Sequence, residues 1–95
     1  MDNYLPDLEL LESTHSFPGT YLFKVIGSAE GNFVGRVVAA VRSELAESIE
    51  PSFSIRKTAG RRHVCVTIEP PVTDGMQVLA IYRSLQEIDG LVMLL

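Results

Sequence analysis

Two segments of alternating apolar and polar residues, joined by a short turn, constrain the fold of this chain most. The segments are residues 52–58 and 62–69, and their apolar positions are Phe53, Ile55, Val64, Val66 and Ile68. Strict alternation is typical of a strand that buries one face. Because Ala59-Gly60-Arg61 separates the two segments, the pattern predicts an antiparallel hairpin with one face in the core.

A strand and a helix are predicted before this hairpin. Residues 19–26 are rich in aromatic and β-branched side chains, which favour a strand. The next amphipathic segment predicts a helix over Phe33–Ser48, with apolar residues at helical spacing: Val34, Val37, Val38, Val41 and Leu45. The segment Gly27–Asn32 joins the two as a loop, and Asn32 suits the N-cap of the helix.

A helix and a strand are predicted after the hairpin. Asp74 has Gln77 three residues later, which is the spacing of a capping box at the start of a helix. Gly90 is the residue type expected just beyond the end of that helix. The apolar run 91–95 predicts a final strand.

The predicted order of strand, helix, strand, strand, helix, strand is typical of an α+β, ferredoxin-like βαββαβ sandwich. We expect a four-stranded antiparallel sheet with strand order 4-1-3-2 and two helices on one face. The side chains expected to meet the helices are Phe23, Val25, Phe53, Ile55, Val64, Val66 and Ile68. Those expected on the opposite face are Leu22, Lys24, Ile26, Ser54, Arg56, His63, Cys65 and Thr67.

The length of 95 residues fits one small domain, which we place at residues 17–95. Residues 1–16 hold four carboxylates and no Lys or Arg, so we interpret them as an acidic N-terminal tail. With 46% hydrophobic residues and one cysteine, the composition excludes a disordered chain and a disulfide scaffold. The first four residues do not resemble a signal peptide, and the longest apolar runs have five residues, so we expect a cytoplasmic protein without a membrane span.

A basic cluster marks the tip of the hairpin. Its members are Arg56, Lys57, Arg61, Arg62 and His63, which we predict to be a docking patch for an anionic ligand or partner. The alternative is a solvated hairpin tip, and the acidic tail could also fold back onto the cluster. A pI of about 5.0 and the lack of outward aromatic side chains on the central strands argue against nucleic-acid binding.

The loop before the first helix is a candidate ligand site. A glycine-bracketed loop that leads into a helix N-terminus offers backbone N–H groups to an anion. The residues concerned are Gly27, Ser28, Gly31 and Asn32. The alternative is that the two glycines only permit backbone turns, and Glu30 would oppose an anionic ligand.

The final strand is a candidate self-association edge. It is apolar on both faces and carries no charged residue over Leu91, Val92, Met93, Leu94 and Leu95. In the predicted strand order it lies at an edge of the sheet, where such a strand favours pairing with another chain. We therefore expect a homodimer or a protein partner, unless another segment of the chain covers this edge.

Several features in the same order and spacing resemble the YbeD-like family of small bacterial proteins. They are Phe17-Pro18, Lys24-Val25-Ile26-Gly27, Phe33 with the helix valines, Gly60, Val66-Thr67-Ile68, Gln77, Ile81-Tyr82-Arg83 with Leu85, and Val92-Met93-Leu94-Leu95. The resemblance implies a ferredoxin-like fold similar to ACT domains, which are small regulatory modules. The sequence departs from the family pattern at Arg61-Arg62-His63.

The resemblance implies no catalytic residues and no cofactor. We therefore expect a non-enzymatic, ACT-like regulatory or protein-interaction module that takes a small-molecule effector at the loop of residues 27–32. One alternative is a small acylphosphatase-like hydrolase that uses Arg36, and another is a plain adaptor without a ligand. His15, His63 and Cys65 have no recognised metal-ligand spacing, so we predict no metal site.

Overall fold

A computed structural model of the chain describes residues 5–95, so the predictions for residues 1–4 of the acidic tail lie outside the described residues. Along residues 5–95 the elements are α1 (Leu8–Thr14), β1 (Gly19–Thr20), β2 (Phe23–Ser28), α2 (Phe33–Arg42), β3 (Ser52–Lys57), β4 (His63–Glu69), β5 (Pro71–Val72), α3 (Gly75–Gln86) and β6 (Leu91–Leu94). The α+β class and the antiparallel pairing of the strands are confirmed.

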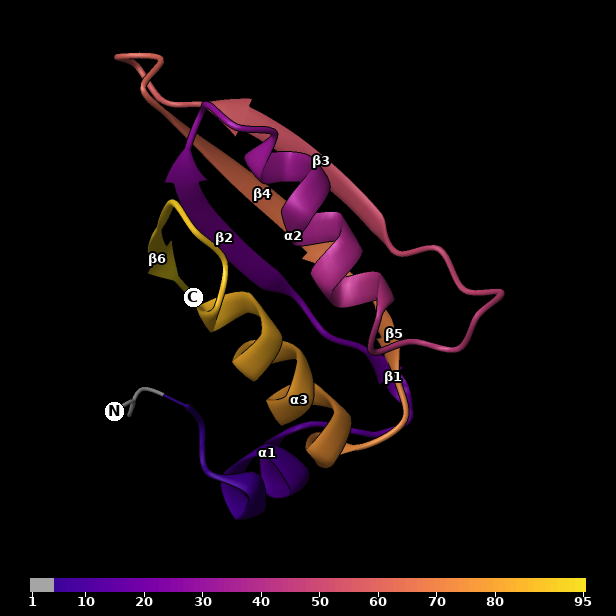
Figure 1. Cartoon of the computed structure of the whole chain (residues 1–95). Coiled ribbons are helices and arrows are strands. Elements are labelled where there is room, and N and C mark those ends of the chain that lie inside the picture. The colour runs from indigo at the N-terminus through magenta and orange to yellow at the C-terminus, as the bar shows by residue number, and fades with distance from the viewer. Residues whose placement is uncertain (1–4) are drawn as a thin grey trace.

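The main sheet has four strands in the order β3-β4-β2-β6 (Figure 1). Read from β6, these are the fourth, first, third and second of the four long strands along the chain. β3 and β6 are therefore the two edges. A second sheet of two strands, β1 and β5, was not predicted from the sequence. It forms just beyond Pro70, whose carbonyl oxygen accepts a hydrogen bond from the Tyr21 N–H at 3.1 Å.

The two long helices differ in how well the sequence predicted their ends. α2 ends at Arg42 rather than at Ser48, because the N–H groups of Glu44 and Leu45 bond carbonyls only three residues back. Asn32 precedes α2 in the left-handed conformation, with φ of 56°, and its side chain makes no capping bond. Asn32 therefore occupies the N-cap position, as predicted, and its carbonyl accepts the Arg36 N–H at 3.1 Å, but its side chain does not cap the helix.

The start of α3 follows the prediction. The Asp74 carboxylate accepts a hydrogen bond from the Gln77 N–H at 2.9 Å. The Gln77 side chain reaches back in turn, and its Oε1 accepts the Thr73 N–H at 2.7 Å. The first bond satisfies a backbone donor that the first turn of the helix leaves open, and the second ties the residue before the N-cap to that turn.

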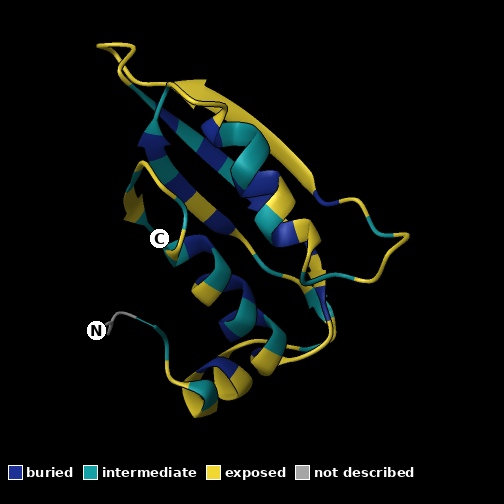
Figure 2. Ribbon diagram, viewed as in Figure 1, coloured by how far each residue is buried: buried dark blue, intermediate teal, exposed yellow. Residues whose placement is uncertain are grey.

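The core lies between one face of the main sheet and the two long helices (Figures 1 and 2). Its fully buried side chains come from β2, β4, α2 and α3, and the largest are Phe23, Phe33, Ile68, Ile81 and Leu85. Phe53 and Ile55, which were expected to meet the helices, are instead 48% and 53% exposed. They do face the helix side, but α2 packs over β2 and β4 and leaves the edge strand β3 uncovered.

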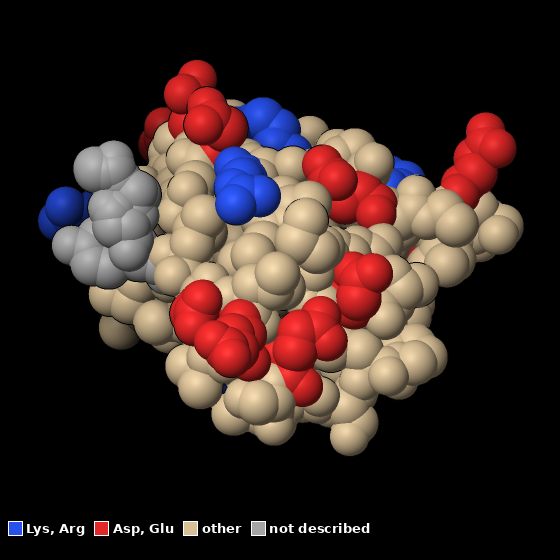
Figure 3. Space-filling view, turned by 90° about the horizontal axis from the view of Figure 1, so that it is seen from below, with Lys and Arg blue, Asp and Glu red and all other residues tan. Residues whose placement is uncertain are grey.

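The segment interpreted as an acidic tail contributes to the fold. α1 packs against α3, and Leu11 is only 3% exposed in the common core. α1 lies at the opposite end of the molecule from the tip of the β3–β4 hairpin, so the described part of the acidic segment does not fold back onto the basic cluster (Figure 1). Viewed from the α1 end, Asp and Glu side chains gather on the surface (Figure 3).

Candidate functional site

The face of the main sheet that the helices leave open carries a mixed set of side chains. Strand register places Ser54 beside Thr67 and Lys24, and Arg56 beside Cys65 and Ile26. The predicted outward orientation of these residues is therefore confirmed. Because three strands contribute neighbouring side chains, groups far apart in the sequence meet on this face.

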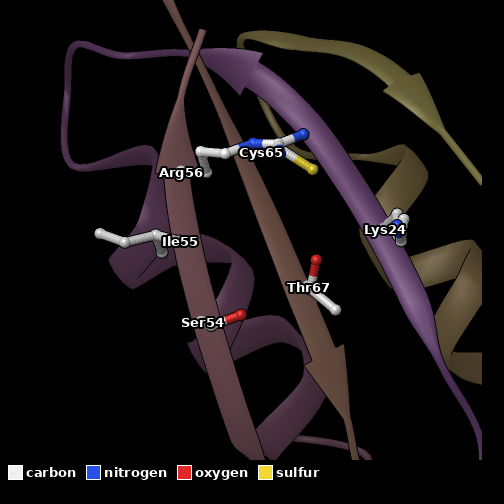
Figure 4. Close-up of a pocket in the computed structure, with 6 residues that line it drawn as sticks. All are labelled: Lys24, Ser54, Ile55, Arg56, Cys65 and Thr67. Atoms are coloured by element: carbon white, nitrogen blue, oxygen red, sulfur yellow. The ribbon is translucent and has the colours of Figure 1, made fainter.

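A depression of about 350 Å³ lies on this open face (Figure 4). It is lined by Lys24, Ser54, Ile55, Arg56, Cys65 and Thr67. In Figure 4 the Ile55 side chain points away from the others, as its register position on the helix side requires. The side chains left to meet a ligand are two cations, two hydroxyls and one thiol, and none of them is a carboxylate.

The electrostatics of the depression favour an anion. Neither Lys24 nor Arg56 forms an ion pair within residues 5–95, whereas Arg42 is bound to Glu50 at 2.9 Å. β4 has one carboxylate on this face, that of Glu69, which lies two positions beyond Thr67 and outside the lining of the depression. An ammonium, a guanidinium and two hydroxyls together supply the hydrogen-bond donors that a carboxylate or phosphate accepts.

The residues of the predicted basic docking patch do not all lie on one face of the sheet, and their docking role stays a prediction. Arg56 and His63 lie on the open face, whereas Lys57 pairs with the buried Val64 and faces the helix side. Arg61 and Arg62 lie in the turn. The sequence grouped these cations because they are neighbours along the chain, but alternation along a strand sends adjacent side chains to opposite faces.

The sequence interpretation missed the group that the fold assembles. Lys24 joins Arg56 across β4, and Ser54 and Thr67 lie beside them. A signal for this group was present in the sequence, because all four residues were assigned to the outward face. Only the strand order shows that the outward positions of the three strands are neighbours.

The candidate ligand loop is held by bonds within the chain. The N–H groups of Ser28 and Ala29 donate to the carbonyls of Gly90 and Arg62, each at 2.9 Å. The Glu30 N–H donates to the Ser28 hydroxyl at 3.2 Å. These bonds use backbone donors that were expected to be open to an anion. The ligand site at Gly27, Ser28, Gly31 and Asn32 stays a prediction, and the loop lies next to the hairpin tip.

Arg36, the residue on which a hydrolase would depend, is engaged within the chain. Its Nε donates to the Gly31 carbonyl at 3.0 Å and its Nη1 to the Asp89 carbonyl at 2.7 Å. The guanidinium also lies 5.8 Å from the centre of the Phe33 ring. These contacts assign Arg36 the structural role of tying the loop of residues 27–32 to the turn before β6.

The final strand lies at a sheet edge, as predicted. Val92, Met93 and Leu95 are about half exposed, at 59%, 49% and 58%. A groove of about 310 Å³ runs between this strand and α3, lined by Tyr82, Gln86 and the four residues of β6. Self-association at Leu91–Leu95 stays a prediction.

Metal-ligating residues do not cluster in the part of the chain that the structure describes. Across residues 5–95, no three His, Cys, Asp or Glu side chains gather where they could hold a metal ion. His15 stacks on aromatic rings instead, with ring centroids 5.9 Å from Phe17 and 5.0 Å from Tyr21. No helix in these residues is both long and apolar enough to cross a membrane.

Residues 12–95 match the family described as "Protein of unknown function (DUF493)". The chain belongs to the DUF493 family. Its relatives include a "UPF0250 protein" of Shewanella piezotolerans, 33% identical over 82 residues, which are 86% of each chain. Another from Shewanella oneidensis is 30% identical over 82 residues, again 86% of each chain. The resemblance to YbeD-like small bacterial proteins is thus confirmed.

The DUF493 match contains the open face of the sheet as well as the core. It begins at Glu12 in α1 and includes every strand. The family description names no reaction and no ligand. The chemistry of this DUF493 chain therefore has to be argued from its own side chains.

Proposed function

We propose that this DUF493 domain is a non-enzymatic, ACT-like regulatory module of ferredoxin-like architecture that binds an anionic group on the open face of its sheet. The architecture is supported by the strand order β3-β4-β2-β6 and by the position of α2 and α3 on one face. The observation that carries the binding proposal is that both Lys24 and Arg56 line a depression whose lining has no carboxylate.

Binding rather than reaction is proposed because the lining side chains include neither a carboxylate nor an imidazole. These are the usual general bases, and without one Ser54 and Cys65 lack an activating partner in the depression. Arg36 is bound to two carbonyls, which removes the support for an acylphosphatase-like reaction. The ligand that fits is a carboxylate or phosphate group of a small molecule.

The depression is open to water, so its attraction for an anion is screened by salt. Charges separated by more than about 10 Å interact little at 0.1 M ionic strength. We expect the binding to be weak for inorganic phosphate alone and to fall as salt is added. Arg56 supplies a planar guanidinium that can grip two oxygens, and Lys24 adds a second charge from the far side.

The experiment is an NMR titration of the labelled chain with inorganic phosphate and with acetate at constant ionic strength. Amide shifts should concentrate at Lys24, Cys65 and Thr67. Lys24→Ala and Arg56→Ala should each raise the phosphate Kd at least about tenfold, which corresponds to about 1.4 kcal/mol. Lys57→Ala is the matched control, because Lys57 is an exposed cation on β3, like Arg56, but lies on the opposite face of the sheet.

The outcomes separate the two candidate sites. Amide shifts confined to Gly27–Asn32 would show that the anion binds at the loop before α2 instead. Equal weakening by Lys57→Ala would reduce the effect to general charge attraction, and an absence of shifts with both anions would reject anion binding.

A plain adaptor without a small ligand is the second candidate, and the exposed apolar edge β6 favours it. An extended segment of a protein partner would add a strand beside Val92 and Met93. A partner that copurifies with the chain from its host should be lost with Val92→Glu and kept with Lys24→Ala. The opposite pattern would place that partner on the open face instead.

A further inference from the structure

β3 is an edge strand whose charged residues, Arg56 and Lys57, both lie at its C-terminal end. All six of its residues are exposed, as the continuous yellow of this strand in Figure 2 shows. Its register with β4 is regular over its full length, from Ser52 opposite Glu69 to Lys57 opposite Val64. Edge strands of natural proteins are commonly blocked by charges, prolines or bulges. The central part of β3, Phe53–Ile55, has none of these.

The exposed side chains of β3 are sorted by face. Phe53 and Ile55 lie on the helix side and are 48% and 53% exposed. A smaller cavity of about 180 Å³ lies beside Ile55, between α2 and the β3–β4 hairpin. Ser52 and Ser54 lie on the open side. An occupant of this edge must therefore be apolar on one face and small or polar on the other.

We propose that the occupant is β3 of a second copy of this chain, paired antiparallel about a two-fold axis at Ser54. An axis perpendicular to the sheet keeps the helices of both copies on one face and joins the two sheets into one. The pairing places Ser54 opposite its own equivalent. It places Phe53 opposite the second copy's Ile55, and Ser52 opposite the second copy's Arg56.

In this register, side chains of similar chemistry lie next to one another in each row across the joined sheet. On the helix side, Ile68 and Phe53 continue into Ile55 and Val66 of the second copy, which makes an apolar row. On the open side, Thr67 and Ser54 of one copy lie next to Ser54 and Thr67 of the second copy, which makes a row of hydroxyls. Directly opposed apolar side chains stabilise the pairing of two strands.

The outer row supplies charge complementarity. Glu69 pairs with Ser52 at the start of β3, and Ser52 would lie opposite the second copy's Arg56. Because the serine side chain is short, the guanidinium can extend over it toward the Glu69 carboxylate, and this contact competes with anion binding in the depression that Arg56 also lines. The two-fold axis makes this contact twice, and it keeps the two Arg56 side chains apart.

Other registers match less well. An axis at Ile55 would place Phe53 opposite Lys57 and Ser54 opposite Arg56. An axis at Phe53 would place Pro51, which has no N–H to donate, opposite Ile55 near the centre of the pairing, whereas the axis at Ser54 leaves it opposite Lys57 at the end of the strand. A shift of one residue would send the apolar side chains of the two copies to opposite faces.

β6 is the weaker edge for self-pairing, although the sequence favoured it. It has four residues against six in β3. Its register with β2 is interrupted between Ile26 and Gly27, whereas the β3–β4 register has no break. Irregular pairing bends a strand and works against a flat, extended ladder with another chain.

The test is sedimentation of the full chain over a range of concentrations. The native chain should form a dimer, and Phe53→Glu and Ile55→Lys should each raise the dimer Kd at least about tenfold. Mixing these two variants should restore association, because the introduced carboxylate at position 53 would face the introduced ammonium at position 55. Both native side chains are about half exposed, so both variants should keep the native circular dichroism spectrum.

Cross-linking tests the axis itself. In a Cys65→Ser background, Ser54→Cys should form a disulfide-linked dimer, because directly opposed Cα atoms lie about 4.5–5.5 Å apart. Ser52→Cys is the matched control, and it should not cross-link because it lies two positions from the axis. Equal cross-linking of both variants would overturn the register.

Two further variants separate this proposal from the others. Val92→Glu, on β6, should leave the dimer intact, and Lys24→Ala should weaken anion binding without affecting the dimer. A chain that stays monomeric at every concentration would overturn self-pairing at β3. So would a dimer that dissociates with Val92→Glu but not with Phe53→Glu.

Discussion

The ring of Phe33, at the start of α2, lies directly against Gly27 in β2. A Cβ atom at position 27 would overlap this ring and would lie 2.7 Å from the carbonyl oxygen of Gly90. Phe33 is only 2% exposed, so its ring has no room to move aside. Close packing among β2, α2 and the turn before β6 therefore leaves no room for a side chain at position 27.

Gly27→Ala should lower the free energy of unfolding by about 1–3 kcal/mol, the usual cost of overpacking a core. Urea denaturation measures this loss. Gly60→Ala is the matched control, because a Cβ atom there meets nothing within 4 Å, and it should change stability by less than about 0.5 kcal/mol. An equal loss in both variants would contradict the packing role.

Glu12 should stabilise α3 from outside that helix. Its Oε2 accepts the Gly75 N–H at 2.7 Å, which satisfies an open donor in the first turn of α3. Glu12→Ala should lower the free energy of unfolding by about 1 kcal/mol and loosen α1. Glu9→Ala removes an exposed carboxylate from the same helix α1 and should have little effect. Similar losses in both variants would show a general effect of acidic charge instead.

Tyr82 should make the fold sensitive to high pH. Burial, together with the hydrogen bond to the Tyr21 hydroxyl at 3.3 Å, raises the pKa of Tyr82 well above its ordinary value. The folded chain thus holds this proton more tightly than the unfolded chain. The contribution to stability is complete below the ordinary tyrosine pKa of 10.0 and is lost as the pH rises above it.

Urea denaturation at about pH 9 and about pH 11 tests this linkage. The native chain should lose more stability between the two than Tyr82→Phe, in which nothing at position 82 titrates. The two chains differ only at position 82, so the effects of pH on other groups cancel in the comparison. An equal loss in the two chains would assign the high-pH effect to other groups.

Arg36 should hold the loop before α2 to the turn before β6. Arg36→Ala removes two bonds to carbonyls and should cost about 1–3 kcal/mol. Hydrogen exchange should become faster at Ser28, whose N–H bonds Gly90 next to this contact. Arg36→Lys should not restore protection, because one ammonium cannot reproduce the guanidinium fork. Arg62→Ala, which removes an exposed arginine of the hairpin turn, is the control.

The hairpin shows how far local patterns predict this fold and where they fail. Alternation correctly predicted β3 and β4 as strands and gave each side chain its face. It could not show that Phe53 and Ile55 would stay exposed, because burial also depends on whether a helix lies above the strand. α2 covers β2 and β4, so the inward positions of β3 face open space.

The candidate site shows the same division. Each member of the Lys24 and Arg56 group was correctly placed on the outward face, but the predicted patch followed neighbours along the chain and included Lys57. The sequence pattern also did not predict that α1 packs against α3. The single buried residue of α1, Leu11, makes no periodic signal, and its place is set by contact with α3.

The sequence by itself determined the kind of each long element and the face of each strand side chain, because these follow from periodicities of two and 3.6 residues within one segment. The tertiary structure alone decided which strand of the sheet the helices leave uncovered and how α1 packs against α3. These features depend on how segments far apart in the chain pack together, which the periodicity within one segment does not predict.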